Sequence, residues 1–271
     1  MSSSLDQQHV DRNIRIHDRI ADSYDKTHDE IFNEVEQSRL RAALERTKKE
    51  IRTGSERPRA LDFGCGSGNL TRHLLELGFE TVAADVSGGF LRLIESRFGG
   101  QGATTFHMDG KSLAGLADGS FDLVASYSVL HHVPDYLGAV AEMARVTCPG
   151  GIVYIDHEHS ADYWRADPVY REFVRRARRV DWRKFLDPHA YYGKLRRLLF
   201  DPRYSNEGDV HVWPDDHIEW DAIETELGKT GFEILFAEDF LVCRSGYRRS
   251  VYERYRQSCT DMRVMAMRKT V

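Results

Sequence analysis

The chain has 271 residues, 41% of them hydrophobic, which is enough to fill the core of one large α/β domain. Its net charge of −5 gives no sign of a nucleic-acid-binding protein, and no run approaches the roughly 20 apolar residues that cross a bilayer. The four cysteines are far apart, and the amino terminus lacks the basic and apolar regions of a secretion signal. We therefore expect a soluble, cytoplasmic protein with reduced thiols.

Two helices are expected before the first strand. Residues 5–25 carry spaced apolar side chains among many charges, as in a surface helix with one inward stripe. A longer helix is predicted from about residue 33 to 51, and Gly54 and Pro58 end it. Residues 1–55 therefore form a helical N-terminal segment in this interpretation.

The stretch 61–71, Leu-Asp-Phe-Gly-Cys-Gly-Ser-Gly-Asn-Leu-Thr, combines a short apolar run, three alternate glycines and a helix start. It predicts the first strand, a tight turn and the first helix of an α/β sheet. Without side chains at Gly64, Gly66 and Gly68, the backbone can turn sharply and a flat ligand can lie against the main chain. A dinucleotide-binding turn would have its third glycine at the position of Asn69. The spacing therefore favours a nucleoside site of another kind.

Strands and helices alternate after this turn. Apolar runs predict strands at 81–84, 103–108, 121–127 and 152–156, with helices between them at about 70–77, 89–98 and 134–146. Asp85 and Asp109 each follow a strand, and a carboxylate at such an end can accept two ribose hydroxyl hydrogen bonds. Nearer the carboxyl terminus, helices are expected at 219–230 and 247–257 and strands at 232–236 and 262–267. Strand–helix alternation with short connections predicts a parallel, doubly wound sheet in a single α/β domain.

These motifs, in this order, resemble the class I S-adenosylmethionine-dependent methyltransferases, whose glycine turn reads Asp-x-Gly-x-Gly-x-Gly, here from Asp62. The resemblance is to small-molecule enzymes of the ubiquinone and menaquinone type, and it covers residues 15–158 and, more loosely, 219–269. It implies a seven-stranded, mostly parallel Rossmann-like sheet whose last strand inserts antiparallel beside the sixth. It also implies S-adenosyl-L-methionine as the cofactor, with the segment 1–55 lying over it.

The resemblance assigns roles to particular residues. Asp85 would hold the ribose, Asp109 would meet the adenine amino group, and the loop after the fourth strand would face the methyl group. Tyr24 would come near the methionine part of the cofactor, although a tyrosine there equally suits ordinary packing. The full set of expected cofactor-binding residues is Tyr24, Asp62, Gly64, Cys65, Gly66, Gly68, Asp85, Val86, Asp109, Gly110, Ser126 and Tyr127.

Three histidines are candidates for a catalytic base, because a histidine titrates close enough to neutral pH to take a proton. His131 follows the fourth strand, within a Leu-His-His-Val-Pro-Asp run that also occurs in relatives with very different substrates, which equally suits a role in loop structure. His157 and His159 follow the fifth strand, where alternation would place them on one face and Asp156 and Glu158 on the other. A metal would need a further ligand, for which the candidates are His211, Asp215, Asp216 and His217. We expect no metal.

The segment 157–214 is longer than the usual connection of the family and predicts an inserted helical cap over the strand ends. Its central part, 165–203, holds twelve Arg or Lys against five acids, together with seven aromatic residues. A cap explains both features if aromatic side chains close over the acceptor while Arg175, Arg178 or Arg179 binds its anionic group.

The sequence thus predicts methyl transfer to a small or medium-sized acceptor, at oxygen, such as an anionic metabolite, a natural product or a sugar-linked compound. One alternative is an RNA or protein methyltransferase that uses the basic insert as a polymer-binding surface. Another is a non-catalytic nucleoside-binding module. A nicotinamide dehydrogenase is disfavoured by Asn69 and by the antiparallel final strand. The oligomeric state, a homodimer included, stays open.

Overall fold

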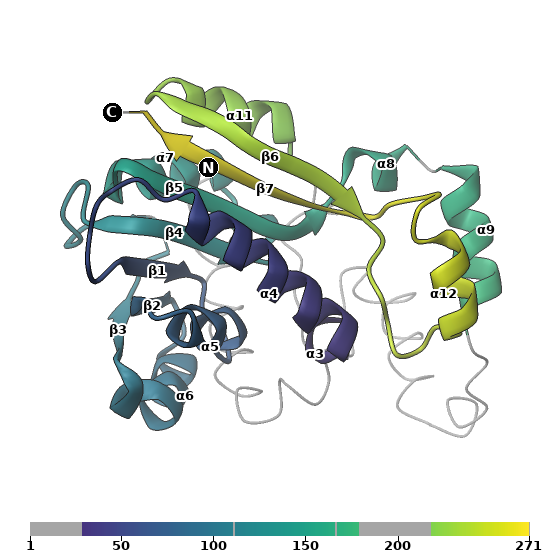
Figure 1. Cartoon of the computed structure of the whole chain (residues 1–271), viewed down its shortest axis with the longest axis horizontal. Coiled ribbons are helices and arrows are strands. Elements are labelled where there is room, and N and C mark those ends of the chain that lie inside the picture. The colour runs from purple at the N-terminus through teal and green to yellow at the C-terminus, as the bar shows by residue number, and fades with distance from the viewer. Residues whose placement is uncertain (1–28, 111, 166, 179–217, 271) are drawn as a thin grey trace, which may run out of the picture.

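The computed structural model describes residues 29–110, 112–165, 167–178 and 218–270. One seven-stranded sheet runs through the molecule in the order β3-β2-β1-β4-β5-β7-β6 (Figure 1). Its strands are β1 (Arg59–Phe63), β2 (Glu80–Asp85), β3 (Ala103–His107), β4 (Phe121–Tyr127), β5 (Thr147–His159), β6 (Phe232–Phe240) and β7 (Met262–Lys269). All neighbouring pairs are parallel except those of β7, which is antiparallel to both β5 and β6. The predicted fold class and the inserted last strand are confirmed.

Helices cover both faces of this sheet. They are α3 (Asp29–Phe32), α4 (Glu34–Lys49), α5 (Asn69–Glu76), α6 (Gly88–Phe98), α7 (Tyr136–Val146), α8 (Ala161–Trp164), α9 (Pro168–Ala177), α11 (Trp220–Gly228) and α12 (Arg249–Tyr255), with 3-10 turns at Gly99–Gln101 and Leu130–His132. The predicted helices at 33–51, 70–77, 89–98, 134–146, 219–230 and 247–257 therefore all exist, with ends that differ by a few residues. Among the described residues, none of the helices combines the length and the apolar character needed to cross a membrane.

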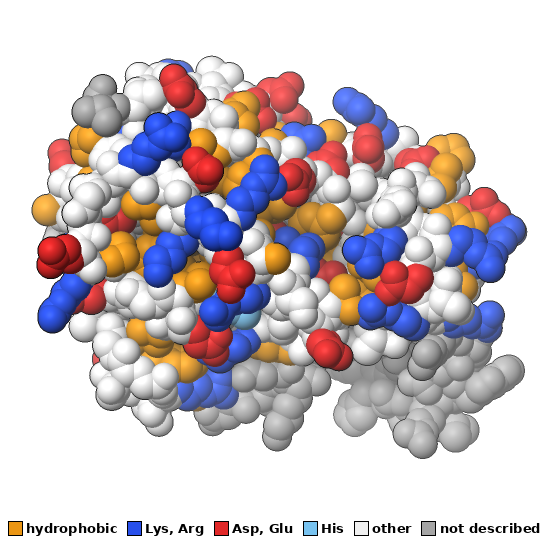
Figure 2. Space-filling model, in the orientation of Figure 1, with side chains coloured by type: hydrophobic (Ala, Val, Ile, Leu, Met, Phe, Trp, Pro, Cys, Tyr) orange, Lys and Arg blue, Asp and Glu red, His pale blue; other side chains and the backbone are white. Residues whose placement is uncertain are grey.

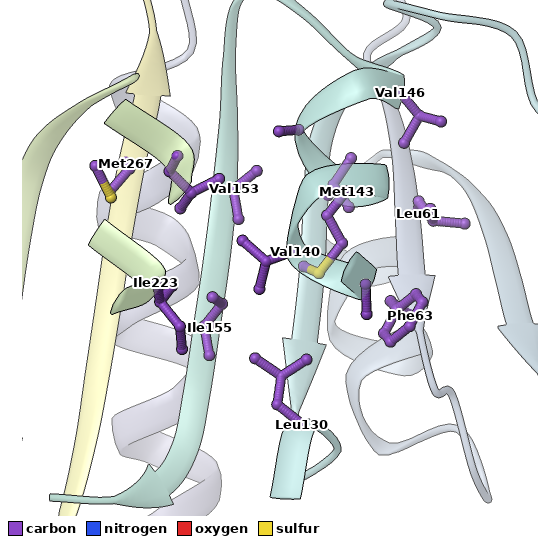
Figure 3. Packing of buried hydrophobic residues seen from close by; sticks show 14 of the residues in the cluster. Leu61, Phe63, Leu130, Val140, Met143, Val146, Val153, Ile155, Ile223 and Met267 are labelled. Atoms are coloured by element: carbon purple, nitrogen blue, oxygen red, sulfur yellow. The ribbon is translucent and has the colours of Figure 1, made fainter. Parts of the chain in front are cut away.

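The sheet has an apolar core on each side. On one face, side chains of β1, β5 and β7 pack against α7 and α11, as Figure 3 shows for Leu61, Val153 and Met267 with Val140 and Ile223. On the other face, Leu40 and Leu44 of α4 and Leu70 and Leu74 of α5 pack against the strands. Burial of both faces explains why the central strands are mostly apolar and do not alternate between apolar and polar residues.

The helix α4 begins at a polar cap and carries one unexpected buried charge. The side chain of Asn33 accepts hydrogen bonds from the backbone amides of Val35 and Glu36, which satisfies the first turn. Leu40 and Leu44 face the core, as their spacing predicts. Glu36, however, is fully buried on the same helix. The helical periodicity alone did not indicate this, because an acidic residue in a charged helix normally faces water.

The strand β5 is much longer than predicted. It runs from Thr147 to His159, whereas the expected strand covered only residues 152–156. The register with β7 shifts between Ile155 and Glu158, and His157 has a positive φ of 60°. The regular alternation expected along residues 156–159 is therefore interrupted at His157, because the prediction assumed a regular extended backbone.

Part of the expected cap is described. The helix α9 packs beside α12 in a small apolar cluster around Phe173 and Tyr252 (Figure 1). It lies beyond the carboxyl end of β5, where the insert was expected. The insert begins after β5, at about residue 160 rather than 157. Residues 179–217 of the expected cap, and residues 1–28 of the expected N-terminal segment with Tyr24, lie outside the described residues.

Candidate functional site

The glycine turn links the ends of β1 and β2. The backbone amides of Gly64 and Cys65 both donate to the carbonyl of Ala84, at 2.8 and 2.9 Å. The next amide, of Gly66, donates to the Asp85 carboxylate at 2.9 Å. The turn is thereby held against the carboxyl end of β2, and the backbone and the acid face one another.

The three glycines of this turn serve different purposes, although all have positive φ values. A Cβ atom on Gly64 would lie 2.5 Å from a methyl group of Val129, and one on Gly68 would lie 2.6 Å from both Ile94 and Phe98. Their missing side chains therefore permit packing within the protein. A Cβ atom on Gly66 would meet no atom of the described residues within 4 Å. Gly66 is thus the position where the turn leaves open space for a ligand against its main chain.

Asp85 is buried, with 6% of its surface exposed, and its second carboxylate oxygen accepts the backbone amide of Ser87 at 2.8 Å. A carboxylate can accept several hydrogen bonds, which suits a group that binds the hydroxyls of a ribose. Asp109 lies at the end of the adjacent strand β3, is exposed, and accepts the amide of Ser112 at 2.8 Å. The two acids that the sequence singled out therefore follow neighbouring parallel strands, beside the turn.

Asp62 and Cys65 are buried parts of the turn rather than ligand-facing groups. The hydroxyl of Thr71 donates to the Asp62 carboxylate at 2.6 Å, which ties β1 to the first turn of α5. Burial, together with the negative charge of Asp85, raises the pKa of Asp62 to about 7. Burial also raises the pKa of the Cys65 thiol well above its usual value, which disfavours the thiolate form.

The remaining expected cofactor residues lie at strand ends. Val86 follows β2 and its carbonyl lies 3.1 Å from a ring nitrogen of His107. Gly110, after Asp109, has a φ of 79°. Ser126 and Tyr127 end β4 and both are buried, and the hydroxyl group of Ser126 has no hydrogen-bond partner among the described residues.

The ends of β4 and β5 carry local backbone strain. Ser128 and His157 both have a φ of 60°, and they are the non-glycine residues with positive φ among those described. They lie side by side, because Tyr127 pairs with Asp156 and the amide of Ser128 donates to the Asp156 carbonyl at 2.9 Å. Such conformations cost free energy and concentrate at functional sites.

His131 is the candidate base that a carboxylate holds in place. Its Nδ1 lies 2.7 Å from one oxygen of Glu158, so that Nδ1 donates to the carboxylate and Nε2 remains the basic nitrogen. The other oxygen of Glu158 accepts the backbone amides of Val129 and Leu130, at 2.8 and 2.7 Å. Glu158 is buried, while the His131 side chain keeps 14% of its surface exposed. The loop after β4 is thus tied to β5 through one carboxylate.

The other two candidate histidines are in different surroundings. His157 is buried and its ring stacks on Tyr127, and burial foremost lowers its pKa well below the usual value. The Nδ1 of His159 lies 3.3 Å from the Asp261 carbonyl, its ring stacks on Tyr163, and burial lowers its pKa to about 4. Among the described residues, neither ring forms a hydrogen bond with a carboxylate, and the charge of Glu158 raises the pKa of His159 by less than burial lowers it.

In the described part of the chain, no group of three or more His, Cys, Asp or Glu side chains could hold a metal ion. The further metal ligands considered from the sequence, His211, Asp215, Asp216 and His217, lie outside that part. The expectation of no metal therefore stays a prediction.

A buried ionic group beneath the strand ends was not predicted from the sequence. Arg39 of α4 binds Glu36 through Nε at 2.9 Å and Asp156 through Nη1 at 3.1 Å. The hydroxyl of Tyr154 also donates to Asp156. Arg39 and Asp156 are 117 residues apart in the chain, so no local pattern could have indicated their contact. Glu158 escaped notice as a partner of His131 because the two residues are 27 positions apart.

Comparison with known proteins agrees with this geometry. Residues 61–155 match a family model described as a methyltransferase domain. The chain is 35% identical over 98 residues to a ubiquinone biosynthesis O-methyltransferase of Methylococcus capsulatus. This aligned region covers 35% of this chain and 41% of the relative. It is 33% identical over 141 residues to a demethylmenaquinone methyltransferase of Corynebacterium urealyticum, over 52% of this chain and 58% of the relative. The match thus spans less than two thirds of either relative.

Solved structures share the fold. An S-adenosylmethionine-dependent methyltransferase from Mesorhizobium loti superposes with a TM-score of 0.54 at 22% identity, over 84% of this chain and 96% of that one. The [4+2]-cyclase SpnF superposes with a TM-score of 0.51 at 18% identity, over 87% of this chain and 81% of that one. The same fold thus occurs in a protein described as a cyclase, so the fold alone does not define a reaction. The family match over residues 61–155, the strand order and the glycine turn together show that the chain contains a class I S-adenosylmethionine-dependent methyltransferase domain.

Proposed function

We propose that the protein transfers a methyl group from S-adenosylmethionine to an oxygen atom of a small or medium-sized acceptor. The observation that carries this proposal is the arrangement at the strand ends. The turn at Gly66 faces the Asp85 carboxylate, and the His131–Glu158 pair follows the strands β4 and β5 in the same sheet. The relatives named as O-methyltransferases support an oxygen acceptor.

The residues fit the cofactor on structural grounds. Gly66 leaves open space at the turn among the described residues, and the Asp85 carboxylate is held there, where it can accept hydrogen bonds from the ribose hydroxyls. Asp109, at the end of the next strand, would accept the adenine amino group. The bound cofactor would supply an electrophilic methyl group, and the protein has to position the acceptor in line with it. A cytoplasmic location belongs to this proposal as well.

His131 would remove the acceptor proton. A hydroxyl group is a poor nucleophile until it loses its proton, and Nε2 of His131 is the basic nitrogen because Nδ1 donates to Glu158. The buried Glu158 carboxylate stabilises the imidazolium that forms and keeps the ring from rotating. His157 and His159 are less suited to this step, because burial lowers their pKa values.

The acceptor would be enclosed by the cap that begins after β5. Arg175 and Arg178, two of the arginines expected to bind an anionic group, are exposed at the end of α9. They would meet an anionic part of the acceptor at the outer end of the site. Arg179, the third, lies outside the described residues.

Calorimetry with S-adenosylmethionine and S-adenosylhomocysteine, followed by transfer of a labelled methyl group to a panel of hydroxylated compounds, tests the proposal. We expect binding of both nucleosides and transfer to hydroxyl groups. Binding without transfer to any acceptor would favour the non-catalytic nucleoside-binding module. A folded protein that binds neither nucleoside would refute the proposal.

A second candidate function is methylation of RNA, which the exposed arginines of α9 and α12 favour. Arg171, Arg175, Arg176 and Arg178 are all exposed on or next to α9, and Arg249, Arg254 and Arg256 on or next to α12. Single alanine variants of these arginines, tested for RNA binding at two salt concentrations, separate the two functions. RNA binding that weakens uniformly with each arginine and with salt is the behaviour of phosphate contacts and would support the RNA enzyme.

A further inference from the structure

A surface groove lies between α4 and α12. Its volume is about 730 Å³, and it is lined by residues of both helices together with Phe240 and Leu241, where β6 ends. None of the cofactor-binding or catalytic residues assigned above that the structure describes lines this groove. Ligand pockets commonly have volumes of roughly 300–1,000 Å³. The groove therefore has room for a small molecule of its own, apart from the proposed methyl-transfer site.

The helix α12 turns two arginines towards this groove. Arg249, Tyr252 and the C-cap residue Arg256 line it, and their spacing of three and four residues places them on one side of the helix. Val251 and Tyr255 pack elsewhere, in the apolar cluster that α12 forms with α9. Contact with α9 therefore does not need the two arginines, which keep 55% and 49% of their side-chain surface exposed.

One carboxylate and one ring hold these arginines in place. The two oxygens of Glu253 bind Arg249 at 2.7 Å and Arg256 at 3.2 Å. The guanidinium carbons of the two arginines lie 5.5 and 5.9 Å from the centre of the Tyr252 ring, within the range of a cation–π contact. The positions of both positive groups are thus defined before any ligand binds.

The α12 wall of the groove is positively charged. Arg249 and Arg256 share Glu253, so this group of three side chains keeps one positive charge. Residues 244–256 as a whole hold five Arg and one acidic residue, although the chain has a net charge of −5. In the view of Figure 2, Arg and Lys side chains gather over α12 and over α4. The charge of the α12 wall favours an anionic ligand.

The α4 wall has a different character. Arg39 lies there, but its charge is balanced by Glu36 and Asp156. The exposed Glu34 on the same wall would repel an anion. The guanidinium carbon of Arg39 lies over the Phe240 ring, 3.8 Å from its centre, so the two side chains form a flat, stacked surface. The groove therefore offers an anion site on one wall and a surface for an aromatic or apolar group on the other.

We propose that this groove binds a small ligand that joins an anionic group, phosphate or carboxylate, to an aromatic or apolar body. The anion would bind Arg256, which uses Nη1 for Glu253 although a guanidinium has five N–H donors, with Arg249 beside it. The body would pack against Phe240 and the stacked Arg39. The inference goes beyond the proposed function and does not depend on it, since its residues differ from those assigned to methyl transfer.

Four probes test the site: phenyl phosphate, benzoate, phenol and inorganic phosphate, each titrated into the labelled protein and followed by NMR chemical shifts. We expect phenyl phosphate or benzoate to bind about fivefold or more tightly than phenol, which lacks the charge, and than inorganic phosphate, which lacks the ring. The tighter of the two aromatic anions identifies the group that the arginines prefer. S-adenosylhomocysteine should not displace it. If the protein binds no nucleoside, the proposed function fails while the titration still tests the groove.

A pair of arginine variants locates the bound anion. Arg256→Gln should weaken binding of the preferred anion about fivefold or more, because a charge-assisted contact is lost at a half-exposed site. Arg254→Gln is the matched control, because Arg254 is exposed on the same helix but does not line the groove. It should change binding by less than about twofold, since an exposed charge at a distance is screened. Both variants should keep the melting temperature of the wild type, because both side chains are exposed.

Equal losses in the two variants would show a general attraction to α12, which is how the phosphates of a polymer such as RNA bind. Equal binding of inorganic phosphate and phenyl phosphate would show an adventitious ion only. Either result would overturn the proposal, as would displacement of the probe by S-adenosylhomocysteine or the failure of both aromatic anions to bind.

Discussion

The carboxylate of Glu158, near the end of β5, lies 2.7 Å from Nδ1 of His131, in the turn that follows β4. If His131 is the base, His131→Asn should lower turnover by about 10²–10⁴-fold with nearly constant cofactor affinity. Glu158→Gln should lower turnover by a smaller factor and move the acid limb of the pH–rate profile to lower pH. The reason is that the Glu158 charge stabilises the protonated His131 ring, so its removal lowers the pKa of His131.

Steady-state kinetics across pH, combined with calorimetry for the cofactor, measures both effects. His132→Asn is the control, because the His132 ring lies in the same turn, with its centroid 4.0 Å from that of the His131 ring. If no single variant of His131, His157 or His159 loses even tenfold in turnover, water removes the proton or the acceptor carries none.

Asp85 should contribute directly to cofactor binding. Asp85→Ala is expected to weaken binding of S-adenosylmethionine by about 1.5–3 kcal/mol, the scale for hydrogen bonds to a charged group. Asp122→Asn is a suitable control, because Asp122 is similarly buried but lies in β4, away from the turn, and accepts the amide of Arg59. Calorimetry that shows unchanged affinity in a folded Asp85→Ala protein would contradict the assignment.

The glycine turn allows fold and binding to be separated. Gly66→Ala should cost only about 1–2 kcal/mol of stability, because its Cβ meets no atom and only the positive φ is strained. It should nevertheless abolish most cofactor binding, because the methyl group enters the open space at the turn. Gly68→Ala should lower the free energy of unfolding by about 2–5 kcal/mol. Its Cβ would overlap with Ile94 and Phe98, in addition to the backbone strain of a positive φ. Chemical denaturation measures the loss of stability in the two variants, and calorimetry measures their cofactor binding. Equal losses of stability in Gly66→Ala and Gly68→Ala would argue against different roles for the two glycines.

Asp62 should make stability depend on pH. Its pKa in the folded protein is about 7, above the usual 3.8, so the folded state binds the proton more tightly than the unfolded chain. The contribution of Asp62 to the free energy of unfolding should therefore be largest below about pH 4 and should be lost as the pH rises from about 4 to about 7. The loss should be on the order of 1.4 kcal/mol for each unit by which the folded and unfolded pKa values of Asp62 differ.

Asp62→Asn removes this contribution while leaving an oxygen to accept the Thr71 hydroxyl. The variant should unfold less readily than the wild type at pH 8 and show a flatter pH dependence. Urea unfolding at pH 5 and pH 8 measures the difference. An unchanged pH dependence would mean that Asp62 is ionised in the folded protein.

The framework of the site was predictable from the sequence because its signals are local. Glycine spacing, apolar runs and the acids directly after them placed Gly66, Asp85 and Asp109 correctly relative to the strands. Periodicity also anticipated the last strand, because its alternating residues continue the sheet.

The parts that were missed depend on contacts between distant residues. Glu36 and Arg39 lie in a highly charged helix, where periodicity predicts solvent exposure. In the interior, however, Arg39 binds Asp156, and Glu36 accepts the backbone amide of Cys243. The predicted strand ended at Asp156, because His157, Glu158 and His159 are all polar. Asp156 and these three residues each contact a separate group from another part of the chain, which lets a polar sequence continue a buried strand.

The position of β7 has a consequence for how the chain folds. This strand, Met262–Lys269, is the last in the sequence, yet it lies between β5 and β6 in the sheet. Its pairing with β5 joins residues that are more than 100 positions apart, as for Ile152 and Arg268. During synthesis, β5 therefore keeps an unpaired edge until residues 262–269 have left the ribosome, and such an edge can pair with other chains. Loss of the last ten residues should thus yield an aggregating protein rather than a slightly shortened enzyme.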